Sequence, residues 1–315
     1  MKQSVLVGPR KSKIMDMPIP EVGPNDVLIK VKACGVCASE LAVWQGNGKY
    51  PAKIGHEIVG DIAKVGSMVE GLKPGMRVTG LIYHAFAEYA ITPQNQVIQI
   101  PDGIPYEQAL GEPLSCIISG ARRTEIELGD TVAIVGLGFM GMLMLQCIRL
   151  KGCAKLIAID LRKEARDLAL KLGADEVLHP SEVPDSLKLT EWDDQGKGYG
   201  VDVAVEATGS QAGLTLAGEM VDTHGVLSIV GYHQKGPRSV DVELWNWKAL
   251  TVINAHERRV DYQMDCMRRG LDLLAAGRLD MESLITHRYT LEQLDAAFQD
   301  LQDKPAGFMK AIVSI

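Results

Sequence analysis

The residues best suited to chemistry are two cysteines and a histidine–glutamate pair near the start of the chain. Cys34 and Cys37 lie in KACGVCASEL, and His56 and Glu57 lie in PAKIGHEIVG. Thiolate, imidazole and carboxylate groups are all ligands of zinc. A Cys-x-x-Cys pair is also typical of a redox motif or of half a structural zinc site. A lone histidine beside an acid is more often a hydrogen-bonded structural residue. These patterns alone therefore leave the chemistry open.

No second Cys-x-x-Cys pair completes a cage of four thiolates in this sequence. The Cys34–Cys37 pair also lies in a region rich in predicted strands, whereas a thioredoxin-like redox pair opens a helix. Both alternatives for the cysteines are thus disfavoured, and these residues by themselves assign no chemistry.

A second chemical motif is the glycine pattern of VGLGFMG, in which Gly136, Gly138 and Gly141 follow an apolar strand and open a helix. In a dinucleotide-binding loop the first glycine permits a tight turn and the second allows a pyrophosphate to approach the backbone. The third glycine allows helix and strand to pack closely, and the helix N-terminus faces the phosphates. Phe139 and Met140, between the second and third glycines, share this predicted contact with the cofactor.

Asp160 closes the next predicted strand, KLIAID, 19 residues after Gly141. A carboxylate at this point accepts hydrogen bonds from both ribose hydroxyls and repels a 2′-phosphate, which favours NAD over NADP. Arg162, two positions later, could stack on the adenine or, as the weaker alternative, meet a phosphate.

The elements that must position these residues change in kind along the chain. Short apolar runs separated by proline and glycine predict a β-rich domain over residues 1–119. Strands and helices then alternate, which predicts an α/β domain with a doubly wound parallel sheet over residues 120–258. We expect residues 259–315 to return to the first domain.

Composition excludes several classes of protein. The chain is 46% apolar and 23% charged, with a net charge of -7, and so lacks the basic footprint expected for a nucleic acid or anionic membrane partner. The longest apolar run, residues 133–148, is shorter than the roughly 20 residues of a membrane span. Six unevenly spaced cysteines and the absence of an apolar signal segment predict free thiols in a cytoplasmic protein.

Taken together, these motifs resemble those of the zinc-dependent medium-chain dehydrogenase/reductase family, which includes alcohol, sorbitol and threonine dehydrogenases. GVCASEL, GHEIVG and VGLGFMGML are similar to the family's metal and nucleotide motifs, and GEPLSC is similar to its polyol-type branch. The match runs nearly from end to end. It implies a GroES-like β-rich catalytic domain joined to a Rossmann domain.

The resemblance also implies the metal ligands. Cys37 and His56 occupy the positions of catalytic zinc ligands, and either Glu112 or Glu57 completes the set. Cys116, four residues after Glu112, is a weaker candidate. A catalytic zinc uses three protein ligands and keeps one position for water or substrate, which agrees with this assignment.

Further family positions concern the proton and the pocket. Ser39 stands where the family has the hydroxyl that accepts the substrate proton, although a serine there could equally cap a helix. Ala42 replaces the histidine by which many relatives pass the proton to solvent, so we expect the proton to leave through the nicotinamide ribose and water or through another base. Trp44 is read equally well as a pocket residue or a core residue.

Two later segments, VEATG and SIVG, resemble the ends of family strands that pass beneath the nicotinamide. Ligands of such sheets bind at the carboxyl ends of strands. Thr208, Gly209 and Gly231 are therefore expected cofactor contacts, with ordinary turn glycines as the alternative.

These implications converge on a zinc- and NAD-dependent enzyme that oxidises a secondary alcohol of a polyol, sugar or related metabolite to a ketone. Two alternative functions are a zinc-free enone or quinone reductase that uses NADPH and a non-catalytic nucleotide-binding protein. The intact set of metal ligands argues against both.

One departure from the family changes the expected metal content. Typical zinc members carry a lobe with four close cysteines after the G-x-R-V segment, whereas this chain has no cysteine between Cys37 and Cys116. We therefore expect one zinc per chain. The resemblance further implies a homodimer or homotetramer formed through residues 250–255.

Overall fold

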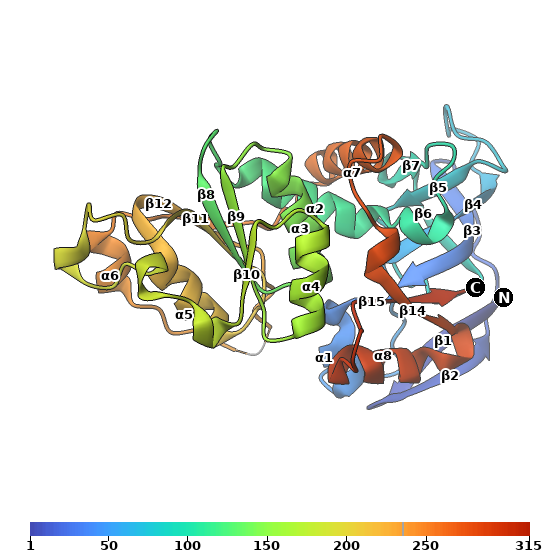
Figure 1. Cartoon of the computed structure of the whole chain (residues 1–315). Coiled ribbons are helices and arrows are strands. Elements are labelled where there is room, and N and C mark those ends of the chain that lie inside the picture. The colour runs from blue at the N-terminus through green and yellow to red at the C-terminus, as the bar shows by residue number, and fades with distance from the viewer. Residues whose placement is uncertain (235) are drawn as a thin grey trace. The chain divides into compact units, whose positions relative to one another are not determined.

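The computed structural model describes residues 1–234 and 236–315. These divide into two compact units: unit 1 comprises Met1–Cys116 with Arg258–Ile315, and unit 2 comprises Ile117–Glu257. Figure 1 shows the course of the chain through both units. Among the described residues, no helix combines the length and the apolar character needed to cross a membrane.

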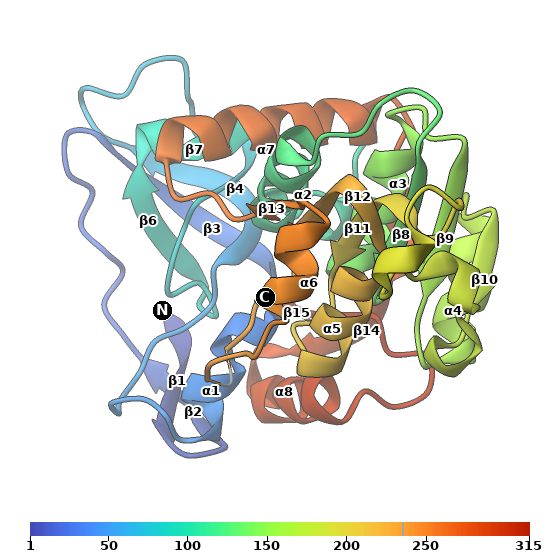
Figure 2. The same ribbon diagram turned by 90° about the vertical axis from the view of Figure 1, so that its left-hand side faces the viewer.

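Unit 1 is built on a seven-stranded sheet. Six of its strands have the order β14-β15-β3-β4-β5-β7, and the seventh, β6, pairs with β3. Helices α7 and α8 lie on opposite sides of these strands in Figures 1 and 2. The strands of unit 1 are β1 (Lys2–Gly8), β2 (Lys11–Asp16), β3 (Asp26–Gly35), β4 (Glu57–Val65), β5 (Arg77–Gly80), β6 (Tyr89–Pro93), β7 (Val97–Gln99), β14 (Ile285–Thr290) and β15 (Lys310–Ser314). Its helices are η1 (Ala38–Glu40), α1 (Leu41–Gln45), η2 (Gln94–Gln96), η3 (Tyr106–Gln108), α7 (Val260–Ala275), η7 (Glu282–Leu284), η8 (Leu291–Gln293) and α8 (Leu294–Asp303), and α2 (Gly111–Arg123) begins in it.

The core of unit 1 anchors α1 on α8. Trp44 is buried, stacks on Phe298 at 5.7 Å between ring centroids, and donates its Nε1 hydrogen to Asp295 Oδ1 at 3.0 Å. Phe86 meets the edge of Phe298 from the other side. Trp44 is thus a core residue, and its packing holds the segment that follows Cys37 in place.

Unit 2 is a parallel six-stranded sheet with the order β10-β9-β8-β11-β12-β13. Its central strands are continuous apolar runs because helices cover both faces; α3 and α4 lie on one face and α5 and α6 on the other (Figure 1). The strands are β8 (Thr131–Val135), β9 (Lys155–Ile159), β10 (Glu176–Leu178), β11 (Val201–Glu206), β12 (Val221–Ile229) and β13 (Thr251–Asn254). The helices are α3 (Phe139–Arg149), α4 (Lys163–Lys171), η4 (Pro180–Glu182), η5 (Asp185–Leu187), η6 (Trp192–Asp194), α5 (Gln211–Met220) and α6 (Val242–Trp247).

The strand order of unit 2 reverses between β8 and β11. The chain starts at β8, moves outward through β9 and β10, and then returns to build β11, β12 and β13 on the other side. In doubly wound sheets ligands bind at such a switch point, outside the carboxyl ends of the strands. The observed architecture confirms the predicted α/β fold, a GroES-like β-rich unit joined to a Rossmann-type unit.

Candidate functional site

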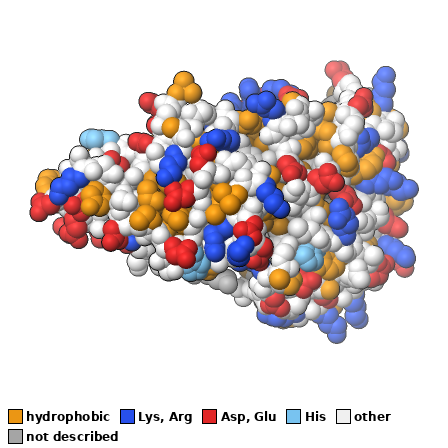
Figure 3. Space-filling view, in the orientation of Figure 1, with side chains coloured by type: hydrophobic (Ala, Val, Ile, Leu, Met, Phe, Trp, Pro, Cys, Tyr) orange, Lys and Arg blue, Asp and Glu red, His pale blue; other side chains and the backbone are white. Residues whose placement is uncertain are grey.

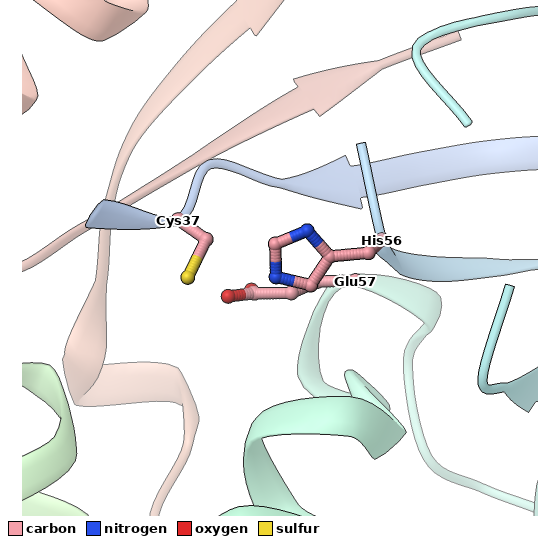
Figure 4. A group of neighbouring side chains, drawn as sticks. All are labelled: Cys37, His56 and Glu57. Atoms are coloured by element: carbon pink, nitrogen blue, oxygen red, sulfur yellow. The ribbon is translucent and has the colours of Figure 1, made fainter. Parts of the chain in front are cut away.

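The register of two antiparallel strands brings the predicted metal ligands together. Gly35, at the end of β3, pairs with Glu57, at the start of β4. Cys37 follows Gly35 by two residues and His56 precedes Glu57 by one, so all three side chains gather at the same end of this strand pair. Figure 4 shows them facing one another. Their candidate ligand atoms all lie within 4.8 Å of one another.

His56 is oriented by a second acidic residue. Its Nδ1 lies 3.0 Å from Glu40 Oε1, which also accepts the Gly55 backbone N–H at 2.6 Å. Burial lowers the pKa of His56, but hydrogen bonds to Cys37 and Glu40 outweigh burial and raise the pKa to about 12. The site therefore holds a proton on His56 where a metal ion would otherwise bind the imidazole.

Glu57 is balanced by a buried lysine. Lys310 Nζ donates to Glu57 Oε1 at 2.7 Å and to the Val36 carbonyl at 3.1 Å, and it lies 2.5 Å from Glu57 Oε2. The side chains of Lys310 and Glu57 are only 5% and 2% exposed. Burial lowers the pKa of Lys310, yet negative groups led by Glu57 raise it overall, which keeps the ammonium charged. A Cβ at Gly35 would come within 2.1 Å of Glu57 Oε2, so only glycine fits opposite this carboxylate.

Helix α2 carries two more of the predicted candidates. Glu112 and Cys116 are four residues apart and share one face of the helix, where Cys116 Sγ donates to Glu112 Oε1 at 3.4 Å. Burial and the charge of Glu57 raise the pKa of Glu112, whereas the charge of His56 lowers it. Among the described residues, however, only Cys37, His56 and Glu57 have candidate ligand atoms that all lie within 4.8 Å of one another.

The donor set of this cluster fits zinc. A thiol, an imidazole and carboxylates are the mixed sulfur, nitrogen and oxygen ligands that zinc accepts. Cys34 does not belong to the set, because it is fully buried and its Sγ contacts the Gly35 carbonyl at 3.6 Å. Ser39 does lie beside it, since its Oγ donates to Cys37 Sγ at 3.2 Å. The structure thus brings together the predicted residues Cys37, Ser39, His56 and Glu57, whereas Glu112 and Cys116 lie outside the group of ligand atoms within 4.8 Å of one another.

The glycine loop of unit 2 has the shape of a phosphate cradle. Gly136 has a φ of +102°, and a Cβ there would lie 2.6 Å from Thr208 Cγ2. A Cβ at Gly141 would come within 2.0 Å of the Gly136 carbonyl. A Cβ at Gly138, by contrast, would meet no atom within 4 Å. Gly138 is also the N-cap of α3, so open space lies at this helix N-terminus, where a pyrophosphate binds in such loops.

Phe139 and Met140 form the first turn of α3, Phe139 buried and Met140 half-buried. The first turn of a helix faces a bound phosphate in loops of this kind, so both residues lie where the sequence predicts the cofactor contact.

Asp160 follows β9 and links the glycine loop to Arg162. Its Oδ2 accepts the Leu137 backbone N–H at 2.7 Å, and its Oδ1 accepts Arg162 Nε at 3.1 Å. Arg162 Nη2 in turn donates to the Leu137 carbonyl at 3.1 Å. Burial raises the pKa of Asp160, but these hydrogen bonds lower it overall, so the carboxylate stays ionised.

The remaining predicted cofactor residues lie in the turns after β11 and β12. Thr208 and Gly209 follow β11, and Gly231 follows β12. A Cβ at Gly231 would come within 2.3 Å of Glu206 Oε2 and 2.4 Å of the Gly209 nitrogen. The two turns therefore pack directly on each other around Glu206.

Sequence reasoning missed several partners of these residues, notably Glu40, Lys310 and Glu206. For Lys310 a signal existed, because GFMKAIVSI is an otherwise apolar strand with one lysine, and a buried charge requires a counterion. Glu40 and Glu206 carried no such signal, since each is the last residue of a short element, where an acid is commonly solvated.

Comparison with known proteins agrees with this geometry. Residues 23–102 match the family model of the alcohol dehydrogenase GroES-like domain, and residues 140–275 match that of the zinc-binding dehydrogenases. The two matches fall on the segments that carry the metal cluster and much of the nucleotide unit.

Individual relatives span almost the whole chain. An alcohol dehydrogenase of Cupriavidus necator is 30% identical over 375 residues, covering 99% of this chain and 98% of the relative. Sorbitol dehydrogenase of Bacillus subtilis is 31% identical, covering 95% and 93%. The crystal structure of a zinc-binding dehydrogenase from Sinorhizobium meliloti bound to NADP has a TM-score of 0.86 at 27% identity, covering 100% and 99%. The chain is therefore an oxidoreductase that belongs to the zinc-type medium-chain dehydrogenase/reductase family.

Proposed function

We propose that the chain is a zinc- and NAD-dependent dehydrogenase that oxidises a secondary alcohol of a polyol, sugar or related hydroxylated metabolite to a ketone. The observation that carries this proposal is the clustering of a thiol, an imidazole and a buried carboxylate within 4.8 Å of one another. Relatives named alcohol and sorbitol dehydrogenases support the class of reaction and of substrate.

In this proposal Cys37 and His56 hold the zinc, and Glu57 or Glu112 completes the set. Zinc, when bound, supplies a Lewis acid that makes the substrate hydroxyl more acidic. Ser39 accepts the hydroxyl proton, because its Oγ already lies beside Cys37 Sγ, at 3.2 Å. Because Ala42 offers no side chain that could carry the proton further, the ribose of the cofactor and water complete its exit.

In unit 2 the glycine loop binds the pyrophosphate and Asp160 binds the adenosine ribose. An ionised Asp160 accepts hydrogen bonds from the two ribose hydroxyls and repels a 2′-phosphate, which supports NAD as the cofactor. The Sinorhizobium relative was solved with NADP. A direct comparison of KM for NAD and NADP therefore tests this assignment, and a preference for NADP would contradict it.

Assembly follows from the edge of the nucleotide sheet. Strand β13 pairs on one side only, with β12, and Thr251 and Val252 are exposed on it. An edge strand with free backbone groups is suited to pairing with another chain. We infer a homodimer through β13, or a homotetramer built from such dimers, which light scattering would measure directly.

The metal content and the compartment complete the proposal. All six cysteines are free thiols, and the reduced Cys37 that a zinc site needs suits the cytoplasm. Lys, Arg, Asp and Glu side chains are interspersed on the face shown in Figure 3, which fits a small-molecule enzyme. We infer one zinc per chain, since Cys37 and Cys116 enclose no further cysteine.

The test is an activity screen on protein of known metal content. Zinc-loaded protein is mixed with NAD and, in turn, polyols, sugars, inositols, threonine and simple alcohols, and the absorbance of NADH is followed. We expect turnover with at least one polyol or sugar and one zinc per chain by elemental analysis. Activity of metal-free protein on an enone with NADPH would instead support a zinc-free reductase.

A further inference from the structure

Glu206 is a fully buried carboxylate that none of the proposed chemistry uses. It ends β11, and its Oε1 accepts the Thr208 backbone N–H at 2.6 Å, the Thr208 hydroxyl at 2.5 Å and the Gly209 backbone N–H at 2.8 Å. Its Oε2 lies 2.9 Å from His233 Nε2. A buried carboxylate is costly unless it is hydrogen-bonded in this way, so these contacts shape the turn after β11.

The protonation of His233 follows from its second partner. Arg238 Nε, which can only donate, lies 3.0 Å from His233 Nδ1. His233 Nδ1 therefore accepts, and the ring hydrogen sits on Nε2 and is donated to Glu206. Both ring nitrogens are thus committed to protein partners, which leaves His233 no free site for proton transfer to a substrate.

Arg238 links His233 back to the turn after β11. Its Nη2 donates to the Gly209 carbonyl at 3.1 Å, while the Gly209 N–H donates to Glu206. Glu206, His233, Arg238 and Gly209 therefore form a closed loop of hydrogen bonds, which we call the Glu206 ring. The ring joins the turn after β11 to the segment after β12, two stretches that also meet where the Val230 and Gly231 N–H groups donate to the Glu206 carbonyl and where Gly209 packs on Gly231.

The Glu206 ring stands at the switch point of the sheet. Strand β11 lies next to β8, and the missing Cβ of Gly136 would lie 2.6 Å from Thr208 Cγ2 and 2.9 Å from the carbonyl carbon of Ala207. The turn held by the ring thus packs directly against the glycine loop. Asp160 lies after β9, on the other side of β8, so β11 and β12 belong to the half of the sheet that takes the second nucleotide.

We propose that His233 is a positioning residue for the nicotinamide half of the dinucleotide. It couples Glu206 to Arg238 and so holds residues 207–210 in the shape that receives the cofactor. This inference rests on the proposed function, because it concerns the same cofactor. It adds a specific residue that acts without touching the reacting atoms.

The test uses NADH fluorescence titrations of the full chain, together with steady-state kinetics. His233→Ala removes both hydrogen bonds of the ring at this residue. His233→Gln keeps a donor toward Glu206 and an acceptor toward Arg238. Arg238→Met leaves the contact between Glu206 and His233 but cuts the link to the Gly209 carbonyl. Lys163→Ala is the matched control, since Lys163 is an exposed residue of unit 2 whose ion pair, within the described part of the chain, is with Asp167 on its own helix.

For His233→Ala we expect the Kd for NADH to rise about tenfold and the KM for NAD to rise with it, more than kcat falls. His233→Gln should recover most of this loss, Arg238→Met should be intermediate, and Lys163→Ala should match the wild type. Hydrogen exchange of residues 207–210 should quicken in His233→Ala. This last readout needs neither metal nor substrate.

Two results would overturn the inference while leaving the proposed function intact. In the first, wild type and His233→Ala bind NADH equally well. In the second, Ala and Gln variants are equally impaired and equally destabilised, which indicates a purely structural histidine. If folded wild-type protein binds neither NADH nor NADPH, the proposed function fails, and the inference fails with it.

Discussion

Two buried carboxylates, one in each unit, are stabilised by different kinds of partner. Glu57 opens β4 and is 1% exposed, and Glu206 closes β11 and is 0% exposed. Glu57 faces the ammonium of Lys310, whereas Glu206 is surrounded by neutral donors from Thr208, Gly209 and His233.

This difference separates a carboxylate that can change partners from one that cannot. The ammonium of Lys310 balances the charge of Glu57 but leaves it beside a thiol and an imidazole, so the carboxylate remains available to a metal ion. The donors around Glu206 are fixed by the backbone of its own turn, and any movement would leave several of them unsatisfied. In the proposed mechanism Glu57 therefore takes part in metal binding, and Glu206 maintains the shape of the cofactor-binding turn.

The largest effect is expected from removing one of the metal ligands that lie beside Glu57. Cys37→Ser or His56→Ala should reduce bound zinc from one per chain to nearly none and lower kcat/KM by on the order of a thousandfold or more, because the Lewis acid is lost. Elemental analysis and NADH absorbance measure both. Cys153→Ser, a buried thiol of unit 2 outside the cluster, is the control and should keep its zinc. Full activity in a zinc-free Cys37→Ser protein would refute the metal site.

A second prediction breaks the ion pair. In zinc-free protein, Lys310→Met should lower the free energy of unfolding by about 3 to 5 kcal/mol, because it leaves the Glu57 carboxylate buried without its cation. The double variant Glu57→Gln with Lys310→Met should regain much of this loss. Urea unfolding of the two single variants and the double variant measures the coupling. Additive effects would show that the two groups do not depend on each other.

A third prediction concerns the neutral surroundings of Glu206. Glu206→Gln should cost about 1 to 3 kcal/mol of unfolding free energy, because its amide would oppose the His233 Nε2 hydrogen and leave buried donors unsatisfied. Urea unfolding measures the cost, and zinc content should remain at the wild-type level. Loss of zinc in this variant would mean that Glu206, like Glu57, supports metal binding.

The last prediction is a pH dependence that should distinguish the two regions. Because the raised pKa of His56 keeps a proton on the imidazole, zinc must displace that proton, and the apparent affinity should increase about tenfold per pH unit for each proton released. Competition with a chelator between about pH 6 and about pH 8, corrected for protonation of the chelator, measures this slope. The affinity for NADH should change far less, since Asp160 with its lowered pKa stays ionised throughout. A zinc affinity that does not vary with pH would contradict the charged state of His56.

The residues that could be predicted from the sequence are those whose role is indicated by neighbouring residues in the same segment. Cys37, His56 and Glu57 lie in short motifs, and the helical spacing of Glu112 and Cys116 places them on one face. The glycine loop and Asp160 are fixed by one strand–helix–strand unit. The fold could be expected because predicted strands and helices alternate after the β-rich part of the chain.

The partners of these residues depend on contacts between distant segments. Lys310 reaches Glu57 only because β15 pairs with β3 in the register that sets Ile312 opposite Gly35. His233 and Arg238 reach Glu206 and Gly209 across the ends of two parallel strands. Strand register and loop packing are tertiary properties, so neither relation could be inferred from spacing along the chain. Trp44 shows the same limit, since only its contact with Phe298 identifies it as a core residue.

The proposed use of zinc at Cys37 and His56 to oxidise a secondary alcohol with NAD can be tested directly. The measurement follows the absorbance of NADH with one active polyol or sugar before zinc removal, after removal by a chelator, and after zinc is returned. We expect turnover to disappear with the metal and to be restored at one zinc per chain. Undiminished turnover in the zinc-free protein would contradict it.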